Sequence, residues 1–443
     1  MRMIRALRIA AVYLTGAALL LLLAAWIINL PVFDEQPDPQ LQSLSAAPAM
    51  SAPEDNAFFA LMGLRADADR DIVESGRKLY ERYAQRHAET GDGTLQPEDF
   101  IELLGSDGPP AWTERYENCN HRSESSCIAS MVEQVRASAD SDPELHRALA
   151  RYQSVVAMRA FGESGPFTLQ SPLPPYGDFL ELSRIAIARA WVDGDSQALA
   201  EALVADLRWW RRMLAQSRSV IGRMVAHAGA RFDLQVINEA VRESRLSADE
   251  LALVAGVLEP LDQEQLTLLP AVASEMETLR NVIDARNRGG EAVLIDGQSL
   301  LIRHFLQPQA TMNLTFRVMM TPLLEAEGLD GPELALRYNS LCELSAETPS
   351  WSPASIYNPG GKYFAAVASA PLTPYLGRLH DFDAMLAATG LHVALAQSPG
   401  EQRDALIAQS LNPWTGQPFV VDDGRIRLSC VEPDVSCDIR LAQ

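Results

Sequence analysis

Residues 9–30 read IAAVYLTGAALLLLLAAWIINL, a run of 22 residues without a charged side chain. A helix of this length measures about 33 Å at roughly 1.5 Å per residue, enough to cross the hydrocarbon core of a bilayer. Three arginines precede the run and three acidic residues follow it: Arg2, Arg5, Arg8, Asp34, Glu35 and Asp38. Because basic residues favour the cytoplasmic side, the sequence predicts one transmembrane helix, with a cytoplasmic stub at residues 1–8 and the rest of the chain exported.

A cleaved signal peptide is the alternative interpretation of the same segment. Such peptides have an apolar core of about 7 to 15 residues with a small-residue cleavage site close behind it. The core is longer here, although the small residues between Ala46 and Ala49 leave a later cleavage site open. We therefore favour an uncleaved anchor.

The charge balance of the exported part limits its partners. Removing the three arginines before Ile9 leaves 34 basic residues against 58 acidic ones, a formal net charge of −24. A field of this sign repels nucleic acid and anionic lipid head groups, so we predict no nucleic-acid partner. With 47% apolar residues the chain is long enough to bury a large core, and its composition leaves the oligomeric state open.

Four of the five cysteines form two close pairs, Cys119 with Cys127 and Cys430 with Cys437. Such pairs indicate local disulfides in an oxidising compartment, which agrees with the predicted export of this part of the chain. A metal site is the alternative, but C-x-x-C spacing and nearby histidine ligands are missing, so we predict no metal and no cofactor. Cys342 is left over, and a buried thiol is its simplest interpretation.

Composition divides the exported part into segments. Residues 31–54 are rich in Pro, Ala, Ser and Gln, which predicts a flexible tether. An N-terminal helical region with the first disulfide loop is expected at residues 55–161, and a helical array at residues 178–349. A C-terminal helix with a small sheet is expected at residues 350–443. Glycines and prolines between residues 162 and 177 mark the boundary before the array.

Helix-forming residues fill 178–262, with breaks expected at Asp193-Gly194-Asp195, at 217–219 and at 244–247. The first of these breaks resembles the turn between the helices of tetratricopeptide-type repeats, although the full repeat consensus is missing. A long helix is expected at 263–288. The pattern predicts an antiparallel array of helical hairpins.

The last residues predict a three-stranded antiparallel meander. Phe419–Val421, Arg425–Cys430 and Cys437–Leu441 alternate apolar and polar residues, and Asp423-Gly424 is a hairpin signal. The fold class expected for the whole chain is therefore mainly α, with this small sheet at the end.

A resemblance covers about 85 residues of the same region. Asn358-Pro-Gly-Gly-Lys, a long helix and then Asn412-Pro-Trp-Thr-Gly-Gln-Pro resemble the closing segment of a group of uncharacterised, singly anchored bacterial envelope proteins. These end in a helix, a D-P-[FW]-[ST]-G-x-P turn and a small sheet, and Asn412 stands where they usually have Asp. The resemblance implies a fold and a location, namely the bacterial inner membrane with the bulk of the chain in the periplasm. It implies no activity.

One segment is unusually basic for so acidic a chain: Arg208, Trp209, Trp210, Arg211 and Arg212. Guanidinium groups pair with carboxylate or phosphate, and indole rings stack on sugar or peptide, so the segment is a candidate site for an envelope protein or an anionic glycan. The alternative is that a tryptophan packs inward while the arginines pair with acidic neighbours. Both interpretations stay open from sequence.

The sequence contains no metalloprotease, nucleophile-elbow or complete nucleotide-loop motif. We therefore expect an interaction or scaffold protein of the cell envelope more than an enzyme. One alternative is a periplasmic hydrolase that acts on glycan or peptide through paired carboxylates. The other is a carrier that binds an apolar ligand along a methionine-rich stripe at Met312, Met319 and Met320, for which core filling is the commoner use.

The topology can be tested with a fusion. Alkaline phosphatase joined after Gln443 should be active in intact bacterial cells, because the enzyme matures only on the oxidising side of the membrane. Its activity is compared with that of a fusion placed directly before Ile9, which should be inactive. An inactive C-terminal fusion of normal abundance would contradict the predicted orientation.

Overall fold

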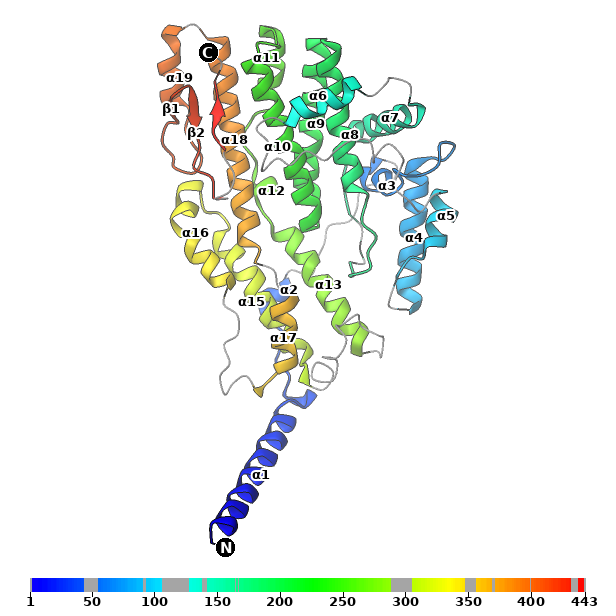
Figure 1. Cartoon of the computed structure of the whole chain (residues 1–443), viewed down its shortest axis with the longest axis vertical. Helices are drawn as coiled ribbons and strands as arrows, with labels where there is room; N and C mark the ends of the chain where they lie inside the picture. The colour runs from blue at the N-terminus through cyan, green and yellow to red at the C-terminus, as the bar shows by residue number, and fades with distance from the viewer. Residues whose placement is uncertain are drawn as a thin grey trace.

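The chain is described by a computed structural model that covers residues 2–43, 55–90, 93–105, 127–137, 142–163, 165, 167–287, 305–346, 356–368, 371–398, 400–431 and 437–441. Over these residues it is mainly α-helical, as the sequence predicts, with one small antiparallel sheet. The helices pack into an elongated body from whose narrow end the first helix projects (Figure 1).

That projecting helix is α1 (Arg2–Ile28). Its apolar stretch Ile9–Ile28 is 20 residues long, and none of it is buried against the rest of the chain. Twenty residues rise about 30 Å, the thickness of a bilayer's hydrocarbon core. The chain therefore has one N-terminal helix that is long and apolar enough to span a membrane.

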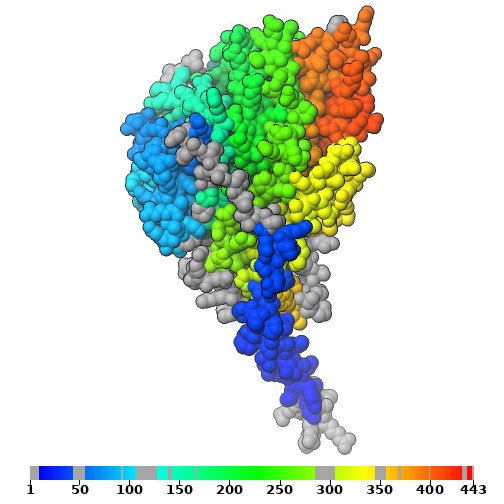
Figure 2. Space-filling model, turned by 180° about the vertical axis from the view of Figure 1, so that it is seen from behind, coloured from blue at the N-terminus to red at the C-terminus, as the bar shows by residue number. Residues whose placement is uncertain are grey.

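The segment after α1 differs from the predicted flexible tether at 31–54. Residues Pro31–Phe33 form a 3₁₀ helix, and Pro39–Ser43 form the short helix α2, whose Leu41 is buried. This segment lies against α15 (Pro308–Ala326), and Figure 2 shows it following the outside of the narrow end of the body. Its composition resembles that of a linker, but its polar groups have partners about 275 residues later. Residues 44–54 lie outside the described part of the chain.

The N-terminal helical region begins with α3 (Ala57–Met62), every residue of which is buried. Two glycines let α3 and α4 (Ile72–Thr90) approach closely: a Cβ atom on Gly76 would lie 1.9 Å from the carbonyl oxygen of Phe59, and one on Gly63 would lie 1.9 Å from that of Ile72. Three further helices complete the region: α5 (Pro97–Leu104), α6 (Cys127–Ala137) and α7 (Pro143–Ala157). Cys127 is disulfide-bonded, and Cys119 lies outside the described residues.

Four helices joined by short connections form the array: α8 (Tyr176–Asp193), α9 (Ser196–Gln216), α10 (Val220–Arg242) and α11 (Ala248–Ala255). The breaks fall where the sequence predicts them. Gly194 takes the left-handed conformation at φ 74°, and the carboxylate of Asp195 accepts a hydrogen bond from the Ala198 N–H. Ser247 and Glu250 form the expected capping box.

The helix expected at 263–288 is divided in two. Helix α12 (Gln263–Leu266) ends at Thr267, and α13 (Leu269–Asn287) starts with Pro270 in its first turn. The break is stabilised by Arg223 of α10, whose guanidinium donates to the carbonyl oxygens of Glu264 and Thr267. The break thus has a local cause, Pro270, which lacks the N–H that a continuous helix would need, and a distant one, Arg223.

The rest of the chain forms helices α15 and then α16 (Gly331–Ala346), α17 (Pro359–Ala368), α18 (Thr373–Gln397) and α19 (Arg403–Gln409), the last preceded by a 3₁₀ turn at Gly400–Gln402. Helix α18 lies beside α10 in the middle of the body, and α17 lies at the narrow end near α1 (Figure 1).

The predicted meander is present at the far end of the body. Strands β1 (Val420–Asp422), β2 (Arg425–Arg427) and β3 (Ile439–Arg440) are antiparallel in the order β1-β2-β3, with Ile426 opposite both Val421 and Ile439. Asp423 and Gly424 make the hairpin turn with positive φ angles of 45° and 66°. The disulfide Cys430–Cys437 is formed as expected.

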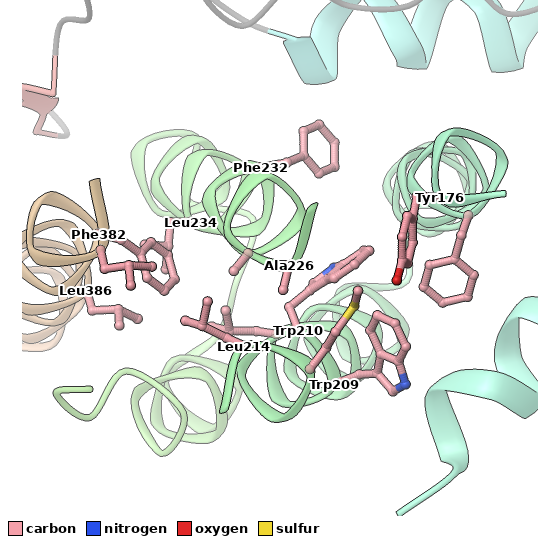
Figure 3. Close-up of a cluster of buried hydrophobic side chains, with 14 of the residues drawn as sticks. Tyr176, Trp209, Trp210, Leu214, Ala226, Phe232, Leu234, Phe382 and Leu386 are labelled. Atoms are coloured by element: carbon pink, nitrogen blue, oxygen red, sulfur yellow. The ribbon is translucent and has the colours of Figure 1, made fainter. Parts of the chain in front are cut away.

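The centre of the body is an aromatic cluster built on α8, α9 and α10 and extended by α18 (Figure 3). The rings of Trp209 and Trp210 lie 4.7 Å apart edge to face, and Phe179 lies 4.6 Å from the first and 5.5 Å from the second. Gly229 of α10 leaves room for Trp210, because a Cβ atom there would lie 2.2 Å from the indole Cε2. Trp210 therefore sets how closely α9 approaches α10, while Trp209 packs against Phe179 of α8.

Gly229→Ala should destabilise the chain. Overpacking against Trp210 costs about 1–3 kcal/mol, which exceeds the gain of roughly 1 kcal/mol from the higher helix propensity of alanine. The matched control is Gly177→Ala in α8, where a Cβ atom meets nothing within 4 Å. Guanidinium unfolding of the full chain in detergent should give a lower midpoint for the first variant only, and equal midpoints would contradict this packing.

Candidate functional site

The basic segment of α9 does not form a continuous face. Trp209 and Trp210 are 1% and 0% exposed and belong to the aromatic cluster. Of the five residues singled out in the sequence, Arg208 is the one whose side chain is exposed. The inward-packing interpretation therefore describes both tryptophans, and Arg208 is the most accessible residue of the segment, since Arg211 and Arg212 are half-buried.

The other two arginines hold neighbouring loops instead of acidic side chains. Arg211 donates to the carbonyl oxygens of Val257, Glu259 and Pro260 at 2.8–3.0 Å, and Arg212 donates to that of Met158. Burial lowers the pKa of both guanidinium groups from its usual value. Their donors satisfy the backbone beyond the end of α11 and beyond the end of α7, which is a structural role.

A pair of buried carboxyl groups lies between α9 and α10. Asp206 and Asp233 are 1% and 0% exposed. Asp206 accepts hydrogen bonds of 2.5 Å from the Tyr152 hydroxyl of α7 and from the Ser183 hydroxyl of α8. Burial raises the pKa of Asp206, and the bonds from Ser183 and Tyr152 oppose this rise.

The pKa of Asp233 is raised well above its usual value, first by burial and then by the charge of Asp206. Neither carboxyl oxygen of Asp233 has a hydrogen-bond partner among the described residues, and a buried carboxyl without a partner favours its neutral form. Glycosidase carboxyls are separated by about 5–10 Å and open to substrate, whereas both members of this pair are closed to solvent. Asp206 joins α9 to α7 and α8, and the pair offers no surface to a glycan or peptide.

A carboxylate also fills the N-terminal end of α10. Glu163 accepts hydrogen bonds from the backbone N–H groups of Arg218 and Ser219 at 2.5 and 2.7 Å, and from the hydroxyls of Ser217, Ser219 and Tyr176. A helix N-terminus favours negative charge because its first N–H groups are free. Here the chain supplies that charge itself, so the end is closed to an external anion.

A small cavity lies where α12, α13, α15 and α18 meet. Its volume is about 30 Å³, and Leu268, Leu323 and His380 are among the residues that line it. This is room for a single water, far below the roughly 300–1,000 Å³ of a ligand pocket. Met312, Met319 and Met320 are buried in the body, so the methionine stripe fills the core. Among the described residues, no cluster of three His, Cys, Asp or Glu side chains could hold a metal ion.

The most distinctive polar arrangement is the one that fastens α1 to the body, which we call the joint and define as Asn29, Asp34, Asn313 and Asn358. Asn29 follows α1 directly and is buried. Its amide donates to the carbonyl oxygens of Ala25 and Ile356 at 2.7 and 2.8 Å, and its side-chain oxygen accepts from the Asn358 N–H at 2.7 Å. One side chain thus bridges the end of α1 and the start of α17.

Asn358 extends the joint to the start of α15. Its side-chain oxygen accepts from the N–H groups of Gln307 and Gly361 at 2.8 and 3.0 Å. Its backbone is left-handed, with φ 50°. Gly361 is needed here because a Cβ atom would lie 2.0 Å from the Thr311 hydroxyl. Asn358-Pro-Gly-Gly is therefore part of the joint. The turn ends at Asn358 because Pro359 already begins α17.

Asp34 supplies the cap of α15. Its two carboxylate oxygens accept from the N–H groups of Gln309 and Ala310, each at 2.9 Å, whereas the side chain of the N-cap residue Gln307 makes no such bond. One turn further along α15, the side-chain oxygen of Asn313 accepts from the Asp38 N–H at 3.0 Å.

The amide of Asn313 donates to Glu35 and to the carbonyl oxygen of Gln36, at 2.9 and 2.8 Å. The segment after α1 is therefore held at several points along two turns of one helix. Sequence reasoning used Asp34 and Glu35 as signs of membrane orientation and missed these contacts. A polar residue that ends an apolar run, as Asn29 does, is the one local signal that could have indicated them.

Comparisons with protein-family models, with curated proteins and with solved structures found no match to this chain. The resemblance of the closing segment to anchored envelope proteins therefore rests on the motifs alone. Within the motif Asn412-Pro-Trp-Thr-Gly-Gln-Pro, Asn412 makes the turn by accepting from the Trp414 N–H. The Trp414 indole donates to Asp381 of α18 at 2.9 Å, so the motif fastens the sheet to α18.

The buried carboxyl pair predicts a pH dependence of stability. Because the pKa of Asp233 is raised in the folded state, the folded chain binds more protons than the unfolded chain above about pH 4. This contribution to stability is complete below that pH and is lost as the pH rises toward the raised pKa. Asp233→Asn, which keeps the size of the side chain but cannot ionise, should remove this loss.

The measurement is guanidinium unfolding of the full chain from pH 4 to 8. The stability of the wild type should fall with rising pH relative to that of Asp233→Asn. Asp193→Asn removes one carboxylate at an exposed site and serves as the control, which should track the wild type. Parallel curves for all three proteins would show that Asp233 is not protonated in the fold.

Proposed function

We propose that this chain is a single-pass inner-membrane protein of a bacterial cell envelope that acts as an interaction or scaffold module. Residues 1–8 would be cytoplasmic, α1 would cross the membrane and the helical body would lie in the periplasm. The apolar length of α1, the arginines before it and the Cys430–Cys437 disulfide support this proposal.

The joint is the observation that carries the scaffold interpretation. An enzyme that acts on diffusing substrates needs only a tether, whereas the body here is bonded to the anchor through Asn29, Asp34 and Asn313. A rigid connection between helix and body is useful when a binding surface of the body must be held at a set height and angle above the membrane. Such a constraint favours a protein that binds another component of the same envelope.

The charge of the body favours a protein partner over an anionic glycan. The exported part has a formal charge of −24, and the helix end at Glu163 is filled by the chain's own carboxylate. Of the basic segment, only Arg208 is exposed. The buried position of Asp206 and Asp233 lends no support to hydrolysis by paired carboxylates. We therefore favour an envelope protein as the partner.

Crosslinking in cells tests the scaffold proposal together with the joint. A photo-crosslinking amino acid is placed in the full chain at separate exposed apolar positions, namely Ile101, Leu169, Leu336 and Val420. At least one position should give a discrete adduct with an envelope protein. The Asn29→Leu substitution replaces the amide by an apolar side chain of similar size, which is tolerated beside lipid. In this background the adduct should weaken because the body is no longer held at one angle.

Asn281→Leu is the matched control, since its amide donates to a loop carbonyl, that of Phe167, far along the chain from the joint. It should leave the adduct unchanged. If no position gives a discrete adduct, the scaffold proposal is wrong. An adduct that is unchanged by Asn29→Leu would show that the joint does not serve partner binding.

A further inference from the structure

The level at which α1 leaves the membrane can be estimated from its length. The apolar stretch Ile9–Ile28 rises about 30 Å and accounts for the whole hydrocarbon core. The head-group layer adds roughly 5–7 Å on each side. If α1 spans the membrane as proposed above, residues 29–33 therefore lie within the head-group layer of the periplasmic leaflet.

Exposed apolar side chains gather at this level. Val32 and Phe33 are 80% and 54% exposed, and Ile356, in the segment before α17, is 39% exposed. We call these three residues the collar. Two hydrogen bonds bring their segments together: Asn29 donates to the Ile356 carbonyl oxygen at 2.8 Å, and the Tyr357 hydroxyl donates to the Phe33 carbonyl oxygen at 3.1 Å.

Polar groups beside the collar have partners within the protein. Both ends of the Asn29 amide are bonded, and the Gln307 amide donates to the Leu30 carbonyl oxygen at 3.3 Å. Groups near the hydrocarbon core need such internal partners because water is scarce there. This arrangement fits a segment placed at the edge of the lipid, where an unbonded amide would be costly.

The charges at this level face the protein. Asp34 and Glu35 are half-buried and bond the start of α15 and Asn313 respectively. The contact with lipid would therefore be apolar and would not depend on anionic head groups. Phenylalanine and tyrosine side chains are well suited to this layer, because their rings are apolar and tyrosine adds a polar end.

We propose that the collar of Val32, Phe33 and Ile356 inserts among the lipid head groups, so that the helical body rests on the periplasmic surface of the membrane. The proposal depends on the membrane-spanning role of α1 proposed above and adds a second, interfacial contact. Trp26 and Ile27, in the last turn of α1 just before this contact, are exposed as well. Together with the joint, it would set the height of the body.

The test uses single cysteine variants of the full chain in phosphatidylcholine nanodiscs. Cys342, which takes part in no disulfide, is first replaced by serine, and the remaining cysteines stay oxidised. An environment-sensitive nitrobenzoxadiazole label is attached at Val32→Cys, Phe33→Cys or Ile356→Cys. Leu21→Cys reports on the middle of α1, and Leu336→Cys, 87% exposed on α16, reports on the body. Nitroxide-labelled lipids act as quenchers at two depths.

The collar labels should emit at shorter wavelength than the Leu336→Cys label. They should be quenched more by a nitroxide on the head group than by one deep in the acyl chain. The Leu21→Cys label should show the reverse order. Collar labels as exposed as that at Leu336→Cys, with the Leu21→Cys label in lipid, would overturn the collar and leave the anchor intact.

If the Leu21→Cys label is also exposed to water, the membrane-spanning proposal fails instead. Collar labels that are shielded from water but unquenched by both lipids would mean that protein, such as a second copy of the chain, covers the collar. That outcome also overturns the proposal.

Discussion

The amide of Asn29 satisfies three backbone groups from two distant parts of the chain at the point where the apolar helix meets the body. Removing one partner from a buried hydrogen bond costs about 1–3 kcal/mol, and the cost is higher beside lipid because water cannot replace the lost partner. The starts of α15 and α17 meet at Asn358, which itself bonds Asn29. The Asn29 side chain therefore connects the end of α1 to both of these helix starts.

Asp34 acts in the same way on a second element. It supplies the cap that Gln307 does not provide, and the positive end of α15 is thereby compensated by a carboxylate from the chain beside the anchor. Helix α15 in turn packs on α13, α16 and α17. Helix α1 and the body are thus coupled through electrostatics and hydrogen bonds over two turns of one helix, and rotation of α1 would break contacts inside the body.

Local chemistry was enough to predict much of this fold. The helix breaks at Asp195 and Ser247 depend on side chains that cap their own helices, and the final hairpin depends on Asp423 and Gly424. The packing of residues 31–43 on α15 and the direction of the arginines on α9 could not be predicted in this way. Each depends on bonds between residues more than 40 positions apart, such as that between Asp34 and Gln309 or that from Arg211 to Val257. The division of the helix at 263–288 combines such a bond, from Arg223 to Thr267, with a local cause, Pro270. Composition and periodicity contain no information about such pairs.

The same long-range bonds explain why several buried charges of the described residues are closed to external ligands. Glu163 closes the N-terminal end of α10, Asp34 closes that of α15, and the buried guanidinium of Arg223 is satisfied by backbone carbonyls. A charge that already has several partners in the chain gains little from an external ligand, because binding would first break those bonds. Recognition by this molecule would therefore depend on its exposed apolar side chains and on the electrostatic field of its net negative charge. A fixed orientation matters most for recognition of this kind, since scattered weak contacts bind well only when the surface that carries them is held in place.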